Sequence, residues 1–384
     1  MIDIQDVSFR YAGAEDWALE HVSLQVKAGE FVVLLGSSGC GKTTLTRLIN
    51  RLVPVFFEGE MTGSVRIGGK DSAGLTLQDL TGMVGSVFQD PRSQFFCTDT
   101  TAELAFSCEN VGLCREEILR RLEKTVQDLG IRSLLERSIF RISSGEKQSI
   151  AIGSVYALGP DILVLDEPSA NLDVKATMHL MEILQILKKQ GFTIVVSEHR
   201  IHYLREVADR AVLMRKGRIE RILGGEEFRS LTNAEANELG LRSMDLKQVR
   251  VSPRGPSFGS DFLRLENISF GFDQKSTLLE GVSFTAGRGD IVGIVGNNGA
   301  GKSTLLEIVC GLQKERSGAV IVNGTALKAK EPYFVRDPSG ERKQNRHPDR
   351  ISMSKNFVFR GEKQRDLFGD AVQRLPAVFR ERGK

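Results

Sequence analysis

The sequence has no long apolar run, and this absence argues against a membrane-spanning protein. Its longest apolar runs are five or six residues, whereas a helix that crosses a bilayer needs about twenty. It also shows no secretory leader, because Asp3 and Asp6 interrupt the N-terminus. The sequence therefore predicts a protein that does not itself cross a membrane.

Cysteines are few, and their placement argues against a disulfide framework and a cysteine-based metal site. They are odd in number and scattered, without the close spacing of metal ligands. Reduced thiols, as in a cytosolic protein, are expected. Cys40 lies in a glycine-rich loop, where it is either a small buried filler or a thiol whose oxidation blocks ligand binding. The five are Cys40, Cys97, Cys108, Cys114 and Cys310.

Two loops of the pattern Gly-x-x-x-x-Gly-Lys-Ser/Thr are present, at residues 36–43 and 296–303. Their glycines let backbone N–H groups converge on phosphate oxygens, the lysine reaches the β- and γ-phosphates, and the final hydroxyl faces Mg²⁺. A glycine-rich turn without a ligand is the alternative. The expected nucleotide-binding residues are Gly36, Ser37, Ser38, Gly39, Cys40, Gly41, Lys42, Thr43 and Thr44, and Gly296, Asn297, Asn298, Gly299, Ala300, Gly301, Lys302, Ser303 and Thr304.

Each loop lies between an expected strand and an expected helix. Residues 31–35 and 291–295 are short continuous apolar runs, as in buried parallel strands. Apolar residues at helical spacing follow both loops, so each loop leads into a helix N-terminus, which favours an anion. This arrangement predicts an α/β fold of the P-loop NTPase type.

The similarity of the two halves extends beyond the loops. Residues 7–11 align with 268–272, and residues 21–24 align with 281–284, at offsets of 260 or 261 residues. We therefore expect a duplicated domain. Tyr11 and Phe272 hold equivalent places upstream of the loops, where each either stacks on a nucleotide base or belongs to the core.

After the first loop, polar residues follow expected buried strands in the order that nucleotide hydrolysis needs. Gln89 ends a strand-like run and is placed to touch Mg²⁺ and the attacking water. The run at 162–165 delivers Asp166 to the metal, and Glu167 directly after it takes the position of the general base.

A histidine follows the next buried run of the chain. Residues 193–196 read as a strand that brings His199 near the γ-phosphate. A structural histidine is the alternative. The expected catalytic residues are Lys42, Gln89, Glu167 and His199, and the expected Mg²⁺ residues are Thr43, Gln89 and Asp166.

Residues 142–148 open a helix with serine and glycine amides, which form an anion site. We expect them to lie across the domain from its own phosphate loop, where they cannot contact a phosphate bound to that loop. With Gln89, residues 166–173 and His199 in this order, the first 225 residues or so resemble the ATPase subunit of ABC systems. The resemblance implies that Ser143 and Gly145 cap the γ-phosphate of an ATP held by a facing domain, so that two domains close head to tail around two ATPs. Ser144 departs from the family's usual glycine and adds a Cβ there.

Three further stretches are similar to the tandem ATPase of energy-coupling-factor transporters, which import vitamins or transition metals. They are residues 89–96, residues 102–106 with 109–110, and residues 197–200, and the fused second copy adds to the likeness. The likeness implies a membrane scaffold subunit docking near residues 90–110, a separate substrate-binding membrane subunit, and a place at the cytoplasmic membrane face. Phe95, Phe96 and Phe106 otherwise build the core of the helical subdomain.

The second copy stops short of its hydrolysis motifs. We expect a complete ABC ATPase domain at 1–240, a linker at 241–260 with its Pro, Gly and Ser residues at 252–260, and a fragment of a second domain at 261–324. Residues 325–384 carry 15 Lys and Arg against 8 Asp and Glu, which predicts disorder. Contact with anionic lipid or nucleic acid and an altered reading frame at the gene's end are alternatives.

The resulting expectation is an α/β fold with a parallel-sheet core, a helical subdomain and N-terminal antiparallel strands, followed by an incomplete second copy. The favoured function is an ATP- and Mg²⁺-dependent transport ATPase that contacts no nucleic acid. A soluble ABC protein acting on ribosomes or DNA, and a remnant that binds nucleotide without productive turnover, are the alternatives. Hydrolysis is expected to depend on the first copy alone, paired with the first copy of a second chain or of a paralogue.

Overall fold

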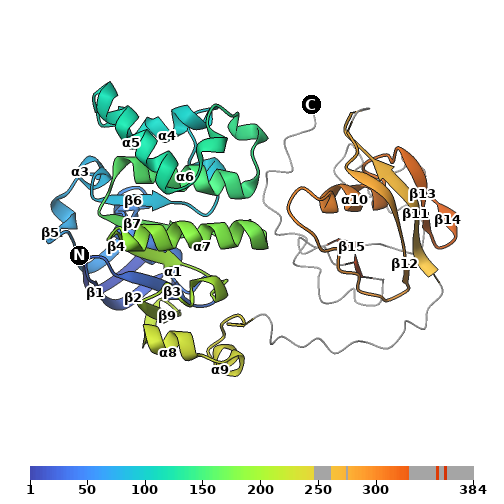
Figure 1. Cartoon of the computed structure of the whole chain (residues 1–384). Helices are drawn as coiled ribbons and strands as arrows, with labels where there is room; N and C mark the ends of the chain where they lie inside the picture. The colour runs from blue at the N-terminus through green and yellow to red at the C-terminus, as the bar shows by residue number, and fades with distance from the viewer. Residues whose placement is uncertain (246–260, 274–275, 328–351, 354–358, 361–384) are drawn as a thin grey trace. The chain divides into compact units, whose positions relative to one another are not determined.

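The computed structural model describes residues 1–245, 261–273, 276–327, 352–353 and 359–360 (Figure 1). The chain divides into two compact units, residues 1–251 and 252–384. Residues 246–260 of the expected linker at 241–260, and most of the expected basic tail, lie outside the described residues. No helix in the described part of the chain is long and apolar enough to cross a membrane.

A four-stranded antiparallel sheet opens the first unit, as the sequence predicts for its N-terminal strands. Its strand order is β2-β1-β4-β5. Alternate residues of β1 and β2 are buried, so one face of the sheet lies on the core. The strands are β1 (Ile2–Tyr11), β2 (Leu19–Val26), β4 (Gly59–Ile67) and β5 (Lys70–Asp71).

The second sheet of this unit carries the expected parallel core. Its order is β10-β9-β3-β8-β7-β6, and only the β9–β10 pair is antiparallel. The strands are β3 (Phe31–Leu35), β6 (Val84–Val87), β7 (Ile162–Asp166), β8 (Thr193–Ser197), β9 (Arg210–Arg215) and β10 (Arg218–Gly224).

The central strand, β3, is buried on both faces, which explains its unbroken apolar sequence. Phe31, Val33 and Leu35 face one hydrophobic cluster, and Val32 and Leu34 face the other. All five side chains are 0% exposed. Because β3 pairs with β8 on one side and β9 on the other, its carboxyl end lies among the loops that carry the expected site.

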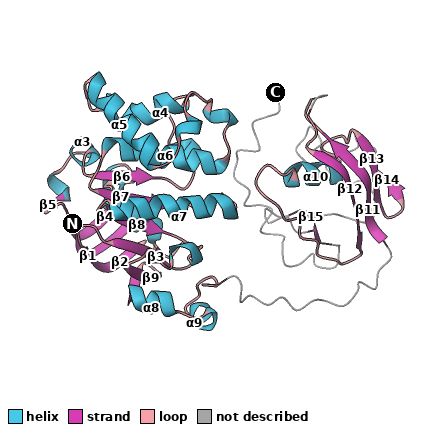
Figure 2. Ribbon diagram, viewed as in Figure 1, coloured by secondary structure: helices cyan, strands magenta, loops and turns pink. Residues whose placement is uncertain are grey.

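Helices cover the parallel sheet, and α4, α5 and α6 form the expected helical subdomain next to β6 (Figures 1 and 2). The α-helices are α1 (Lys42–Ile49), α2 (Leu52–Val55), α3 (Leu77–Thr81), α4 (Thr100–Asn110), α5 (Arg115–Asp128), α6 (Ser144–Leu158), α7 (Val174–Lys189), α8 (Gly225–Ser230) and α9 (Asn233–Glu238). The 3₁₀ helices are η1 (Ser72–Gly74), η2 (Pro91–Ser93), η3 (Arg132–Leu134), η4 (Ile139–Arg141) and η5 (His202–Leu204).

The second unit repeats the antiparallel sheet of the first. Its order, β12-β11-β13-β14, matches β2-β1-β4-β5 strand for strand. The elements are β11 (Asp261–Phe270), β12 (Leu279–Gly287), α10 (Lys302–Val309), β13 (Ser317–Val322) and β14 (Thr325–Ala326), with β15 (Ser352–Met353) paired to β16 (Phe359–Arg360) farther along. The repeat in the sequence is therefore a repeat in the fold.

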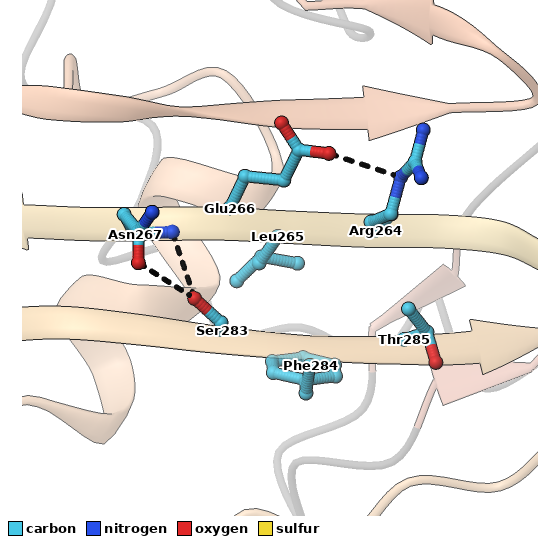
Figure 3. Close-up of a pocket in the computed structure, with 7 residues that line it drawn as sticks. All are labelled: Arg264, Leu265, Glu266, Asn267, Ser283, Phe284 and Thr285. Atoms are coloured by element: carbon cyan, nitrogen blue, oxygen red, sulfur yellow. Dashed lines mark hydrogen bonds and ion pairs between the residues drawn. The ribbon is translucent and has the colours of Figure 1, made fainter.

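The same backbone irregularity, a residue with positive φ, occurs in β1 of the first unit and in β11 of the second. Asn267 has φ 48° and donates its N–H to Ser283 Oγ at 2.8 Å, in an open pocket on β11 and β12 (Figure 3). Asp6 has the same φ and donates to Ser23 Oγ at 3.0 Å. A local backbone feature that recurs with its hydrogen bond supports descent from one duplicated domain. None of the seven residues that line this pocket belongs to the second phosphate loop.

One expected strand is wrong. Residues 291–295 form no strand beyond a single β-bridge residue, Gly293, although they resemble β3 in sequence. Ile291 is 51% and Val295 is 91% exposed. In the first unit β3 is held between β8 and β9, whereas no strand in the described part of the second unit takes either place. A parallel strand needs neighbouring strands to complete its ladder of hydrogen bonds, and one bridge residue does not make a ladder.

Candidate functional site

The first phosphate loop closes around the ammonium group of Lys42. This side chain is 4% exposed, and its Nζ donates to the carbonyl oxygens of Gly36 at 2.9 Å and Ser37 at 3.0 Å. The lysine begins α1, so the loop leads directly into a helix N-terminus. A helix N-terminus and a fixed cation are the features by which a glycine-rich loop binds phosphate.

Two glycines of this loop are required by space as well as by backbone angle. Gly36 has φ 139°, and a Cβ there would lie 2.3 Å from the Met214 carbonyl oxygen. Gly41 has φ 105°, and a Cβ there would lie 2.6 Å from the Ala18 carbonyl oxygen. Rigid backbone leaves no room to move aside, so the glycine pattern is a packing requirement here.

Asp166 ends β7 beside the phosphate loop. Thr43 Oγ1 donates to Asp166 Oδ1 at 3.2 Å, and the Ser197 hydroxyl donates to the same carboxylate. Burial raises the pKa of Asp166, against the lowering effect of these two hydrogen bonds. A partly buried carboxylate next to a threonine hydroxyl offers the oxygen ligands that suit a hard divalent cation such as Mg²⁺.

Glu167 lies between the other two expected catalytic side chains. Gln89 Nε2 donates to Glu167 Oε2 at 3.0 Å, and His199 Nε2 lies 3.0 Å from Glu167 Oε1 without the alignment of a hydrogen bond. Contact with His199 lowers the pKa of Glu167, although burial opposes this. The carboxylate is thus held ionised, as a general base must be. We call Gln89, Glu167 and His199 the hydrolysis cluster.

The backbone at Glu167 is turned sharply to make this contact. Its φ is 44°, in the left-handed region, and its N–H donates to the Ser197 carbonyl oxygen at 2.9 Å. Ser197 therefore holds both adjacent acids, through its hydroxyl at Asp166 and its carbonyl at Glu167. Sequence reasoning missed Ser197 as a functional residue, and a polar residue at the end of a buried strand was the available signal.

Ser143 and Gly145 begin α6, as the sequence predicts. Ser143 and Glu146 form a reciprocal capping box, with Ser143 N–H donating to Glu146 Oε2 at 2.7 Å. A Cβ at Gly145 would lie 2.6 Å from Ala176 Cβ, so this glycine also lets α6 approach α7. In the described part of the chain, the hydrogen bonds of Ser143 stay within this cap and do not reach the phosphate loop.

The aromatic residues expected at the base differ between the units. Tyr11 is half-buried, packs edge-on against Phe9 and Phe57, and its hydroxyl lies 3.1 Å from Thr44 Oγ1. It therefore lies beside the phosphate-loop helix. Phe272 is 76% exposed and packs edge-on only against Phe270 among the rings of the described residues.

The second phosphate loop has the same internal geometry as the first. Lys302 Nζ donates to the carbonyl oxygens of Gly296 at 2.8 Å and Asn297 at 2.7 Å, and Lys302 begins α10. The remaining expected residues of this loop, 298–301 and 303–304, lie between these points or in the first turn of α10. The described part of the second unit contains no counterpart of Gln89, Glu167 or His199.

Two aromatic rings stack at the start of the helical subdomain, and a third exposed ring belongs to a segment that is hydrogen-bonded to the turn before α4. Phe95 packs against the core, whereas Phe96 is 77% exposed and stacks on Phe106 with ring centroids 4.8 Å apart. Phe140 is also 77% exposed, and the neighbouring Ile139 N–H bonds the Thr98 carbonyl oxygen at 3.0 Å. We call Phe96, Phe106 and Phe140 the aromatic patch.

Comparison with known proteins decides the family. The family model described as ABC transporter matches residues 19–170 and 279–381. The chain belongs to the ABC transporter family. An ABC transporter ATP-binding protein of Treponema denticola is 45% identical over 336 residues, covering 86% of this chain and 68% of that protein. One from Methanosarcina acetivorans is 32% identical, covering 84% of this chain and 60% of that protein.

Solved structures confirm the ABC ATPase fold. The structure of cbiO1 from Clostridium perfringens, part of the ABC transporter complex cbiONQ, is 26% identical with a TM-score of 0.55, covering 62% of this chain and 92% of that one. The ATP-binding cassette MJ0796, in a dimeric post-hydrolysis state with ADP and Pi, is 25% identical with a TM-score of 0.52, covering 58% and 98%. This ABC protein is thus an ATP-binding and ATP-hydrolysing subunit of a transporter.

Proposed function

We propose that this ABC ATPase powers import of a vitamin or a transition metal through an energy-coupling-factor type transporter, at the cytoplasmic face of the membrane. The proposal that the protein hydrolyses ATP at this site rests on the hydrolysis cluster, in which the Glu167 carboxylate lies within 3.0 Å of both Gln89 and His199. Glu167 takes a proton from the attacking water, Gln89 orients that water, and His199 contacts the γ-phosphate.

Binding of the nucleotide falls to the first phosphate loop. Lys42 lies in the loop with its ammonium group poised for the β- and γ-phosphates, and Tyr11 is placed beside α1 to meet the base. Thr43 and Gln89 would hold Mg²⁺ directly and Asp166 through its second shell, where the ion neutralises phosphate charge.

The hydrolysis cluster needs a phosphate cap from another domain. Ser143 is exposed at the N-terminus of α6. Among the described residues, its side-chain and N–H hydrogen bonds are to Glu146, and none is to the phosphate loop of its own domain. Two first units of two chains, or one and a paralogue, would each supply the cap that the other lacks. A two-fold axis completes both sites at once. The Ser144 side chain is half-buried within this cap and adds bulk next to the expected phosphate.

Transport requires a membrane partner, and the aromatic patch supplies a surface for it. Exposed aromatic rings are typical anchors of protein interfaces. Phe96 and Phe106 lie within the segment that the resemblance to energy-coupling-factor ATPases assigns to scaffold docking. The substrate-binding membrane subunit would join through that scaffold. The likeness to cbiO1, described as part of a cbiONQ complex, supports this assembly.

Copurification tests the transport assignment. The tagged full chain, extracted from membranes in mild detergent, should retain a multi-span scaffold subunit identified by mass spectrometry. Phe96→Ser with Phe140→Ser should lose it while retaining ATP hydrolysis. Phe56→Ser, a matched change of a 70% exposed ring outside the patch, should retain it. A wild-type chain that hydrolyses ATP and carries no membrane subunit would contradict the proposal.

A further inference from the structure

One buried acid lies next to the hydrolysis cluster and has no role in the chemistry above. Glu198 directly follows β8 and is 2% exposed. Its backbone N–H donates to the Leu34 carbonyl oxygen at 3.1 Å, which ties it to the end of β3. A fully buried carboxylate is costly unless all its lone pairs find donors, so its partners show what it is for.

Both oxygens of Glu198 accept two hydrogen bonds each. Oε1 accepts from the Ser169 N–H at 3.0 Å and the Tyr203 hydroxyl at 2.9 Å. Oε2 accepts from the N–H groups of His199 at 2.7 Å and Arg200 at 3.0 Å. Burial raises the pKa of Tyr203 well above its usual range, and the Glu198 charge adds to this, so its hydroxyl remains a donor.

These donors come from separate segments around the cluster. The N–H groups of His199 and Arg200 belong to the turn that carries His199. The Ser169 N–H belongs to the turn that follows Glu167, and Arg200 Nη1 makes a second tie to this turn through the Leu172 carbonyl oxygen at 2.8 Å. One carboxylate therefore connects the backbone beside the general base to the backbone of the histidine.

We infer that Glu198 is a positioning residue that sets the distance between His199 and Glu167, acting through the backbone of the two turns. It touches no reacting atom. This inference rests on the proposed roles of Glu167 and His199. Misplacement of a catalytic group by about 1 Å costs on the order of a hundredfold in rate. Because Glu198 acts by placing His199, its effect on the hydrolysis rate depends on the presence of His199.

Glutamine is a sharp probe of this arrangement. It has nearly the same shape as glutamate, but one of its two polar atoms is an NH₂ group that only donates. Because each oxygen of Glu198 faces two donors, either orientation of a glutamine amide at this position places N–H against N–H or O–H. A merely space-filling role would tolerate the change. If Glu198 positions the two turns, glutamine at this position should displace one of them.

The test is a double-mutant cycle on the full chain, with kcat and KM for ATP measured by phosphate release. Glu198→Gln should lower kcat about 10- to 100-fold with KM changed less than about twofold. In the His199→Ala background the same substitution should change kcat less than about twofold, because the group that it positions is gone. An equal loss in both backgrounds, or no loss in the wild type, overturns the inference.

Matched variants separate positioning from stability. Glu103 is also 2% exposed and accepts the N–H groups of Phe96 at 3.0 Å and Cys97 at 2.8 Å, away from the cluster, so Glu103→Gln should leave kcat within about twofold. Where Glu198→Gln does not fold, Tyr203→Phe removes one donor, and its smaller loss of rate should likewise vanish with His199→Ala.

Two outcomes distinguish a failure of the proposed function from a failure of this inference. If Glu167→Gln leaves the rate intact, the proposed function fails. If Glu167→Gln and His199→Ala slow hydrolysis and Glu198→Gln does not, only this inference fails.

Discussion

The two phosphate loops have nearly the same conformation and very different surroundings. Gly36, Gly39 and Gly41 have φ values of 139°, 78° and 105°, and their counterparts at 296, 299 and 301 have 156°, 82° and 86°. Each lysine bonds two carbonyl oxygens of its own loop. The loop is therefore a local structure that its own residues specify.

The two phosphate loops differ in the segment that precedes them, which is a buried sheet strand only in the first unit. Residues 31–35 are 0% exposed between two parallel neighbours, whereas Val295 is 91% exposed. The strands β6, β7 and β8 carry Gln89, Glu167 and His199 to the first loop. The comparison shows that phosphate recognition is local, while hydrolysis depends on strands that come from as far as residues 193–197 along the chain.

The largest expected difference between the loops concerns catalysis. Glu167→Gln removes the general base and keeps the size of the side chain, so it should lower the rate about 10²- to 10⁴-fold while ATP still binds. Lys302→Ala changes the second loop and should leave turnover within about twofold. Phosphate release by both variants checks this. Turnover that is lost in Lys302→Ala and kept in Glu167→Gln would reverse the assignment.

The next difference concerns the glycines that end the loops. Alanine at 41 would meet a rigid carbonyl oxygen at 2.6 Å, whereas alanine at 301 would meet the flexible Leu279 side chain at 2.7 Å. We expect Gly41→Ala to destabilise its unit by about 3 kcal/mol and Gly301→Ala by about 1 to 2 kcal/mol. Thermal unfolding followed at Trp17, the single tryptophan, reports the first unit, so Gly41→Ala should lower the midpoint observed there and Gly301→Ala should leave it nearly unchanged. A shift at Trp17 as large for Gly301→Ala as for Gly41→Ala would contradict this.

A smaller effect belongs to the cap, which only the first unit has among the described residues. Burial raises the pKa of Glu146, but hydrogen bonds from Ser143 outweigh it and leave the pKa below 4.5. A lowered pKa means that Glu146 stabilises the fold above pH 4.5 and loses this contribution as pH falls through the folded value. Glu146→Gln should cost roughly 0.5 to 1 kcal/mol at pH 7 and less near pH 4. Denaturant unfolding at both pH values tests this, and a cost that grows toward pH 4 would contradict it.

The smallest expected effect is that of removing the second unit. A chain of residues 1–245 keeps Leu241 and Met244, which are buried in the first unit's core. It should dimerise with ATP and hydrolyse it within about twofold of the full chain, because every residue of the proposed site lies within it. Light scattering and phosphate release measure this. Loss of both activities would show that the second unit contributes to the site.

Several features of the fold and the site were predictable because they depend on neighbours in sequence. The glycine pattern implies the loop, continuous apolar runs imply β3, β7 and β8, and Ser143 with Glu146 implies the start of α6. Gln89, Glu167 and His199 were expected at one site because each follows an expected buried strand, and the resemblance to ABC ATPases agreed with this. The 3.0 Å contacts then came from the order of strands in the parallel sheet.

The sequence by itself determined the two phosphate loops, the duplication of the domain and the residue types of a nucleotide hydrolase, because each of these is visible in the residues and their order along the chain. Only the tertiary structure decided that Glu198 is buried among four donors and that Leu241 and Met244 belong to the first unit's core. It also decided that residues 291–295 form no strand, although their sequence matches β3. Burial and strand pairing depend on residues distant in the chain, and an apolar run becomes a strand only where a neighbouring strand completes its hydrogen bonds.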